Sequence, residues 1–195
     1  MNSSPFLIWL DKNIQQGRKS RNIDRDGRTV TLKEEKKDFR MHVKIENASR
    51  RLVVVNFEQD GKATTYFEGG RGFGDRCDFL VLDETEDEYV AYLIELEAKV
   101  PSSHGASQLR WSAPYLKYIL AVFLEDSRRT SEEKKLTLKF YQIGKEYQSW
   151  IKRKLMKREK GERFAKWDEY HMCDIYYCTY EGHRIEFRDF GITTA

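Results

Sequence analysis

The residues best suited to chemistry lie in two neighbouring segments of the chain. Asp78 stands at the head of an apolar run, and Glu95, Glu97 and Lys99 alternate with apolar residues in the next segment. Successive side chains of a β-strand point to opposite faces, so Glu95, Glu97 and Lys99 share one face. The acidic stretch 83–88 has the composition of a turn, and a hairpin there brings Asp78 opposite Glu95 or Glu97. The pattern predicts two carboxylates and an ammonium beside a third carboxylate.

Such a cluster is typical of a divalent-metal site. Mg²⁺ takes oxygen ligands, prefers one or two carboxylates with water completing its shell, and also binds substrate phosphates. A cation of this kind lowers the pKa of a coordinated water, and a nearby ammonium offsets phosphate charge. Phosphodiester hydrolysis is the reaction that these residue types favour. The alternative is a strand whose charged face meets solvent, with Lys99 placed between glutamates for simple pairing.

Asp78, followed by Glu97-Ala-Lys99 on the next expected strand, resembles the motif of the PD-(D/E)XK nuclease superfamily. Restriction endonucleases and many repair and recombination nucleases belong to that superfamily. The resemblance implies that Asp78 and Glu97 bind Mg²⁺ or Mn²⁺ and that Lys99 assists the attacking water. Cys77 stands where the family usually has proline, and Glu95 is either a further ligand or a support for the others.

The segment that follows Lys99 agrees with this resemblance. Residues 101–107 have the composition of a loop, and residues 108–124 carry apolar side chains at helical spacing. In the family's core, the strand that carries the metal ligands is likewise followed by a loop and then by a helix. Pro114 lacks an amide hydrogen, so we expect the helix to begin at Ser112 or to kink there.

Two residues of this expected helix resemble a further motif. Gln108 and Tyr115 are seven residues apart, which returns to the same helical face. They are similar to a Gln and a Tyr of RecB-like family members, which lie at the rim of the active site. The resemblance implies that Gln108 supports the site and that Tyr115 contacts the nucleic acid.

Charge is unevenly distributed along the chain. Residues 75–97 contain nine acids and one arginine, whereas residues 127–166 contain fourteen Lys or Arg and five acids. The basic segment 145–160 is expected to form an amphipathic helix whose outward residues include Lys152, Arg153, Lys157 and Lys160. This face predicts salt-dependent contact with a nucleic-acid backbone, without base specificity. A solvated face that only favours solubility is the alternative.

Composition narrows the class of protein. The chain has 195 residues, a net charge of +3 and no run of 18 apolar residues, which indicates one folded domain without a membrane span. Three widely spaced cysteines, an odd number, argue against a disulfide framework. The apolar stretch near the N-terminus is too short for a signal peptide, so we expect a cytoplasmic protein. A zinc site among His171, Cys173, Cys178 and His183 is disfavoured, because its spacing is loose and a strand turns the two cysteines to opposite faces.

The expected fold is an α+β sandwich with a mixed central β-sheet flanked by helices, and the resemblance implies a restriction-endonuclease-like core. We divide the domain into residues 1–68 with a helix and strands, a catalytic core at 69–143, and a basic helix with a C-terminal hairpin at 144–195. Besides the elements already named, the pattern predicts a helix at 5–16, strands at 29–32 and 136–143, a hairpin of 40–47 with 51–58, and a hairpin of 174–180 with 183–190.

The leading functional hypothesis is a Mg²⁺- or Mn²⁺-dependent nuclease acting on DNA, with internal and terminal cleavage both compatible with the sequence. Asp78, Glu97 and Glu95 are the expected ligands, and Lys99 and Gln108 complete the catalytic set. RNA is an alternative substrate, because no element that reads bases or the 2′-hydroxyl is recognisable. A non-catalytic module that binds nucleic acid or protein on the same scaffold is the other alternative, and a homodimer is compatible with both.

Overall fold

Two β-sheets, one long helix and one short helix make up most of the described part of the protein. The computed structural model describes residues 5–10, 12–13, 23–26, 29–36, 39–46, 52–57, 76–84, 88–127, 134–149, 164–168, 173–179 and 184–186. The central sheet has six strands, in the order β4 (Val53–Asn56), β5 (Phe79–Glu84), β6 (Glu88–Val100), β7 (Lys135–Tyr147), β9 (Cys173–Thr179) and β8 (Phe164–Asp168). The second sheet has four, in the order β1 (Ile23–Asp26), β2 (Thr29–Lys36), β3 (Phe39–Glu46) and β10 (Arg184–Glu186).

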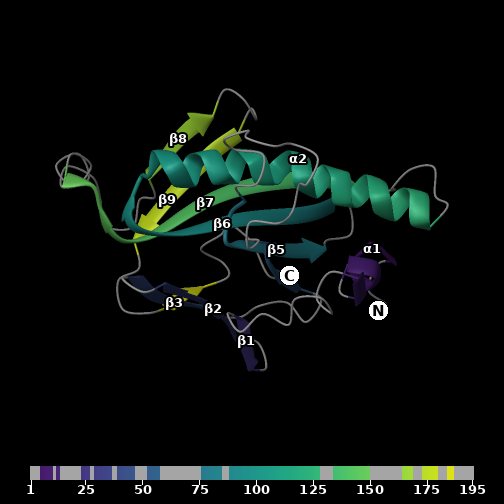
Figure 1. Ribbon diagram of the computed structural model, residues 1–195, viewed down its shortest axis with the longest axis horizontal. Helices are drawn as coiled ribbons and strands as arrows, with labels where there is room; N and C mark the ends of the chain where they lie inside the picture. Colours follow the sequence, from purple (N-terminus) through teal and green to yellow (C-terminus); the bar gives the residue numbers. More distant parts are fainter. Residues whose placement is uncertain are drawn as a thin grey trace.

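Strand directions in the central sheet are mixed. β5 runs antiparallel to both β4 and β6, whereas β6, β7 and β9 run parallel to one another, and β8 is antiparallel to β9. The predicted α+β class with a mixed central sheet is therefore confirmed. Adjacent parallel strands need a crossover connection, and α2 (Ser103–Asp126) supplies it between β6 and β7. Figure 1 shows α2 lying along one side of the central sheet, with the second sheet on the opposite side.

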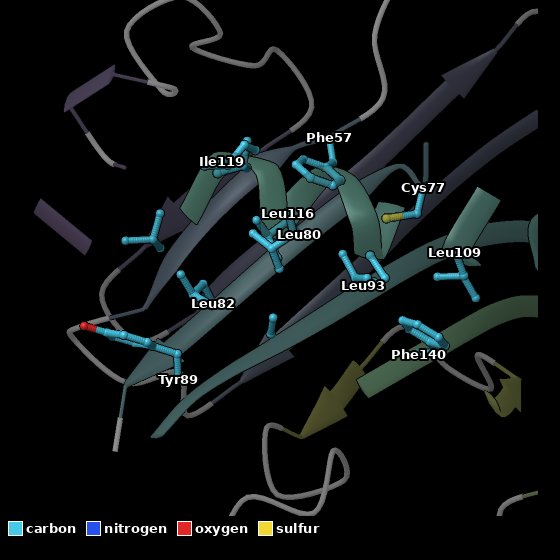
Figure 2. Close-up of a cluster of buried hydrophobic side chains, with 14 of the residues drawn as sticks. Phe57, Cys77, Leu80, Leu82, Tyr89, Leu93, Leu109, Leu116, Ile119 and Phe140 are labelled. Atoms are coloured by element: carbon cyan, nitrogen blue, oxygen red, sulfur yellow. The ribbon is translucent and has the colours of Figure 1, made fainter. Parts of the chain in front are cut away.

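Side chains of β5 and β6 are buried on both faces of the central sheet. Leu80, Leu82 and Leu93 pack on the helical side in one core with α2 and with α1 (Pro5–Leu10), as Figure 2 shows for several of the leucines. Phe79 and Tyr92, one residue out of step, belong to a second core that includes side chains of β2 and β3. Burial on both faces explains the nearly continuous apolar run of β5.

The helix α2 begins earlier than the sequence predicts. Ser102 is its N-cap: the Ser102 hydroxyl accepts from Gly105 N at 3.1 Å, and the Ser102 carbonyl accepts from Ala106 N at 3.1 Å. The expected loop at 101–107 and the expected start at Ser112 are therefore wrong, because the cap satisfies amides that a loop would leave to solvent. Pro114 lies inside the helix. Among the described segments, no helix is long and apolar enough to cross a membrane.

Both predicted outer hairpins are wrong. Residues 40–47 and 51–58 do contain strands, but β3 pairs with β2 and β10, whereas β4 pairs with β5 in the other sheet. Within 174–180 and 183–190, β9 joins the central sheet and β10 runs parallel to β3. Local alternation identifies a strand but does not specify its partner, which depends on the face that each core buries.

Three further elements differ from expectation. The strand predicted at 136–143 is confirmed, but β7 continues to Tyr147 and so takes the first residues of the helix predicted at 145–160. Most of that predicted helix lies outside the described residues. The helix predicted at 5–16 is confirmed for Pro5–Leu10, and β1 and β8 were not predicted from the sequence.

Candidate active site

The register of the β5–β6 hairpin brings Asp78 across from Glu95. Asp83 pairs with Val90 and Phe79 pairs with Ile94, so Asp78, the residue before Phe79, faces Glu95. This register is one of those expected from the acidic turn, and the expectation is confirmed. Of the two glutamates, Glu95 rather than Glu97 is the direct neighbour.

Backbone amides hold both of these carboxylates. Asp78 N donates to Glu95 Oε2 at 3.1 Å, and Leu96 N donates to Asp78 Oδ2 at 2.7 Å. Each carboxylate therefore accepts a hydrogen bond from the backbone of the neighbouring segment. These bonds fix the orientation of the two acidic side chains.

The pair is buried on the face that α2 covers. Asp78 is 1% exposed and Glu95 is 3% exposed. The alternative of a charged strand face in solvent is therefore wrong for these two residues. Burial raises the pKa of the neighbouring Cys77 thiol well above its ordinary value, and the negative charges of Glu95 and Asp78 raise it further. The thiol thus lies in the field of both carboxylates.

Glu97 lies against the first turn of α2. A Cβ atom added to Gly105 would lie 2.7 Å from Glu97 Oε1, 3.0 Å from Glu95 Cγ and 3.1 Å from Gln142 Nε2. The helix approaches the acidic strand this closely because residue 105 has no side chain. Glu97 Oε1 is buried and has no hydrogen-bond partner among the described residues. An uncompensated buried carboxylate oxygen is costly unless something binds it.

Gln142 joins the helix to the sheet and was not singled out from the sequence. It lies on β7 directly across from Glu95 and is fully buried. Gln142 Oε1 accepts from Ser102 N and Gln142 Nε2 donates to Ser102 O, both at 2.8 Å. These bonds fix the N-cap of α2 over the carboxylates. A lone amide side chain inside the apolar run of a strand is the signal that could have indicated it.

The helix also holds the segment that leads into β5. Gln108 Nε2 donates to Arg76 O at 3.2 Å, and the amide of Cys77 donates to Ser112 Oγ at 2.8 Å. The Arg76 guanidinium carbon lies 4.2 Å from the centre of the Tyr115 ring. Gln108 and Tyr115 therefore both contact Arg76, two residues before Asp78. The expectation that they share a helical face beside the site agrees with these contacts.

Lys99 is directed to another carboxylate. Lys99 Nζ lies 3.1 Å from Glu146 Oε1 on β7, and the Lys99 side chain is 55% exposed. Ion pairs as exposed as this one contribute about 0–1 kcal/mol or less. The ammonium can therefore leave Glu146 at little cost when a stronger anion arrives.

Within the described residues, no three His, Cys, Asp or Glu side chains form a ready-made metal site. The donor set nevertheless fits Mg²⁺, which needs only one or two carboxylates and keeps several waters. Asp78 and Glu95 supply the carboxylates, and the buried Glu97 Oε1 lies beside Glu95 Cγ at Gly105. Of the zinc candidates, His171 and His183 lie outside the described residues, as do the basic residues Lys152, Arg153, Lys157 and Lys160.

Comparison with known proteins gives no match: no family model, no curated protein and no solved structure is significantly similar to the chain.

Proposed function

We propose that the protein is a metal-dependent nuclease that hydrolyses phosphodiester bonds, with DNA as the expected substrate. The observation that carries the proposal is the buried pair Asp78 and Glu95, which adjacent strands bring together and backbone amides orient. Buried carboxylates that approach one another are arranged for cation binding or proton transfer more often than for stability. A site that must neutralise phosphate charge accounts for such a pair.

The geometry divides the roles among the acidic residues. Asp78 and Glu95 are the proposed principal ligands, because the register makes them direct neighbours. Glu97, next along the same face, has a buried oxygen with no hydrogen-bond partner among the described residues and is the proposed third acidic group. Bound Mg²⁺ or Mn²⁺ would supply positive charge for the scissile phosphate and favour deprotonation of a water.

The surrounding residues orient these ligands. Gln142 holds the start of α2 through Ser102, and Gln108 holds the backbone at Arg76, so hydrogen bonds tie the helix to β7 and to the segment that carries Asp78. Positioning of this kind limits the motion of the ligands, which a reaction geometry requires. Lys99 is the proposed phosphate-facing cation once it leaves Glu146.

The order of elements supports a relation to the PD-(D/E)XK superfamily. An antiparallel β5–β6 pair is followed by α2 and then by β7 parallel to β6. This order agrees with the strand, helix and acidic residues that the resemblance implies. A restriction-endonuclease-like core is therefore part of the proposal.

A cleavage assay tests the proposal. Supercoiled plasmid, single-stranded DNA and RNA are incubated with the protein in Mg²⁺ or Mn²⁺ and, separately, in EDTA. Cleavage in the metal arms alone is expected, and Asp78→Asn and Glu95→Gln should each abolish it. Lys99→Ala should slow cleavage without weakening metal binding.

Asp83→Asn is the matched control for these variants. Asp83 is also a buried carboxylate of β5 that accepts a backbone amide, from Glu84 at 2.9 Å, but it lies at the opposite end of the strand. It should retain cleavage. The nuclease proposal is refuted when purified protein cuts none of the substrates with either metal, or when Asp83→Asn and Asp78→Asn are equally inactive.

The ion pair that Lys99 forms with Glu146 favours a second candidate, because it occupies the ammonium that the nuclease proposal assigns to the phosphate. That candidate is a non-catalytic module that binds nucleic acid or protein through the same scaffold. It predicts binding that neither EDTA nor Asp78→Asn changes, together with no cleavage in any metal.

A further inference from the structure

The outer face of α2 carries exposed aromatic side chains. Trp111 is 37% exposed and Tyr118 is 62% exposed. Val122, at 36%, continues the same line. Spacings of seven and four residues keep these three side chains on one face of the helix. The opposite face of α2 is already buried in the core with α1 and the central sheet, so the helix is apolar on two sides.

Basic side chains border this aromatic line, and acidic ones are missing from it. Arg110 and Lys117, seven residues apart, are both exposed and share one edge of the outer face. From Ser103 to Leu124 the helix contains no Asp or Glu. From Arg110 to Tyr118 the surface therefore offers positive charge and aromatic rings over about 12 Å of helix axis, as estimated from the rise per residue.

We propose that this outer face of α2 binds single-stranded nucleic acid, with Trp111 and Tyr118 stacking on bases and with Arg110 and Lys117 beside the phosphates. Unpaired bases present their flat faces to aromatic side chains, whereas the bases of a duplex stack on one another. Basic side chains along a nucleic-acid strand contact its phosphate backbone regardless of the base sequence. The inference rests on the proposed function for its choice of a nucleic acid and specifies the substrate of that same site.

Side-chain contacts connect this face to the segment that carries Asp78. Tyr115 stacks with Tyr118 at 6.3 Å between ring centres, and the Tyr115 ring also contacts the Arg76 guanidinium. Arg76 lies two residues before Asp78 on the same segment. A nucleic-acid strand bound along the outer face of α2 would therefore lie on the same helix that covers the carboxylates.

A second copy of the chain is a poorer occupant of this face. Two-fold pairing of antiparallel helices places the same patch on both copies, which would bring the Arg110 and Lys117 edges together. Three partly exposed apolar side chains also fall short of the roughly 1,200 Å² or more that stable interfaces bury. Nucleic acid instead meets both the charge and the rings with complementary chemistry.

Fluorescence anisotropy in EDTA tests the proposal without cleavage. Labelled oligothymidylate, oligouridylate and a duplex of equal length are titrated with the full chain. Wild type should bind both single strands more tightly than the duplex, and Trp111→Ala or Tyr118→Ala should each weaken single-strand binding about fivefold or more. Trp111→Phe and Tyr118→Phe should restore most of it.

Charge and oligomerisation are checked in the same series. Arg110→Ala and Lys117→Ala should each reduce the salt slope by about 0.7, whereas Lys44→Ala, which removes an exposed cation from β3 in the other sheet, should not. Unchanged binding in both aromatic-to-alanine variants overturns the proposal. It is also overturned when those variants convert a dimer to a monomer in analytical ultracentrifugation and leave oligonucleotide binding intact.

The result is separable from that of the nuclease test. When the aromatic variants weaken binding but wild type cuts nothing, the binding face stands and the enzyme proposal fails. When Asp78→Asn abolishes cutting but the aromatic variants bind like wild type, the enzyme proposal stands and this face does not carry the substrate.

Discussion

Gly105→Ala should weaken metal binding while leaving the stability of the fold nearly unchanged. The new methyl would lie 2.7 Å from Glu97 Oε1, 3.0 Å from Glu95 Cγ and 3.1 Å from Gln142 Nε2. Gln142 cannot move easily, because two hydrogen bonds to Ser102 hold it. Glu97 is only half-buried and its contacting oxygen has no hydrogen-bond partner among the described residues, so it should rotate away first.

The cost in stability should be small. Overpacking in a core costs about 1–3 kcal/mol, and alanine recovers about 0.5–1 kcal/mol relative to glycine within a helix. The net loss is then about 0–2.5 kcal/mol, which lowers the Tm by at most about 10 °C in a chain of this size. Displacement of Glu97 should instead lower metal affinity about 10- to 100-fold, the usual effect of disturbing groups around a metal.

Thermal unfolding with and without Mg²⁺ or Mn²⁺ measures both effects. A metal present at 100 times its Kd stabilises the folded state by about 2.7 kcal/mol, and Gly105→Ala should lose at least about half of this at the same concentration. Gly144→Ala is the control, because its methyl would lie 2.8 and 2.9 Å from the two Val100 methyl carbons. It should cost more stability, since a β-branched side chain is stiff, yet keep the metal response. Equal metal stabilisation in wild type and Gly105→Ala would refute the reasoning.

Further predictions concern the surroundings of the carboxylates. Gln142→Leu should lower the free energy of unfolding by about 1–2 kcal/mol in urea titration, because the amide of Ser102 loses its acceptor. Ser112→Ala should cost about 1–3 kcal/mol in the same measurement, because it orphans the buried amide of Cys77. Burial raises the pKa of the Cys77 thiol above its ordinary value of 9.0. The stability that the neutral thiol contributes is therefore fully present below pH 9.0 and declines as the pH rises further. Cys77→Ala should flatten this decline, and an unchanged slope in denaturation at alkaline pH would contradict the assignment.

The β5–β6 hairpin could be predicted because its information is local. Alternation sets the faces of β6, the acidic stretch 83–88 sets the turn, and a slip of one residue would place Asp78 opposite Ile94 or Leu96 instead of Glu95. Asp78 and Glu95 therefore meet as the pattern indicates. The position of Lys99 was less predictable, because its neighbour Glu146 comes from β7, far along the chain.

Features that depend on tertiary contacts were missed. Residues 101–107 resemble a loop in composition, but α2 begins at Ser103, and two hydrogen bonds with Gln142 on the distant strand β7 hold its N-cap Ser102. The burial of Glu95 likewise follows from the position of α2, which covers that face of the sheet. The predicted strand partners of the outer hairpins were wrong for the same reason, since the structure has two cores and similar apolar strands can pack in either of them.

The position of the acids argues for function more than for stability. A buried carboxylate costs several kcal/mol even when it is partly compensated, and Leu93, two residues earlier on the same face as Glu95, shows that this face accepts leucine. A strand selected only for packing would extend that leucine pattern through position 95. Asp78 and Glu95 instead interrupt it at the point where Gly105 lets the helix approach and Gln142 fixes its start. The proposed cation site accounts for acidic side chains in this covered, backbone-anchored position.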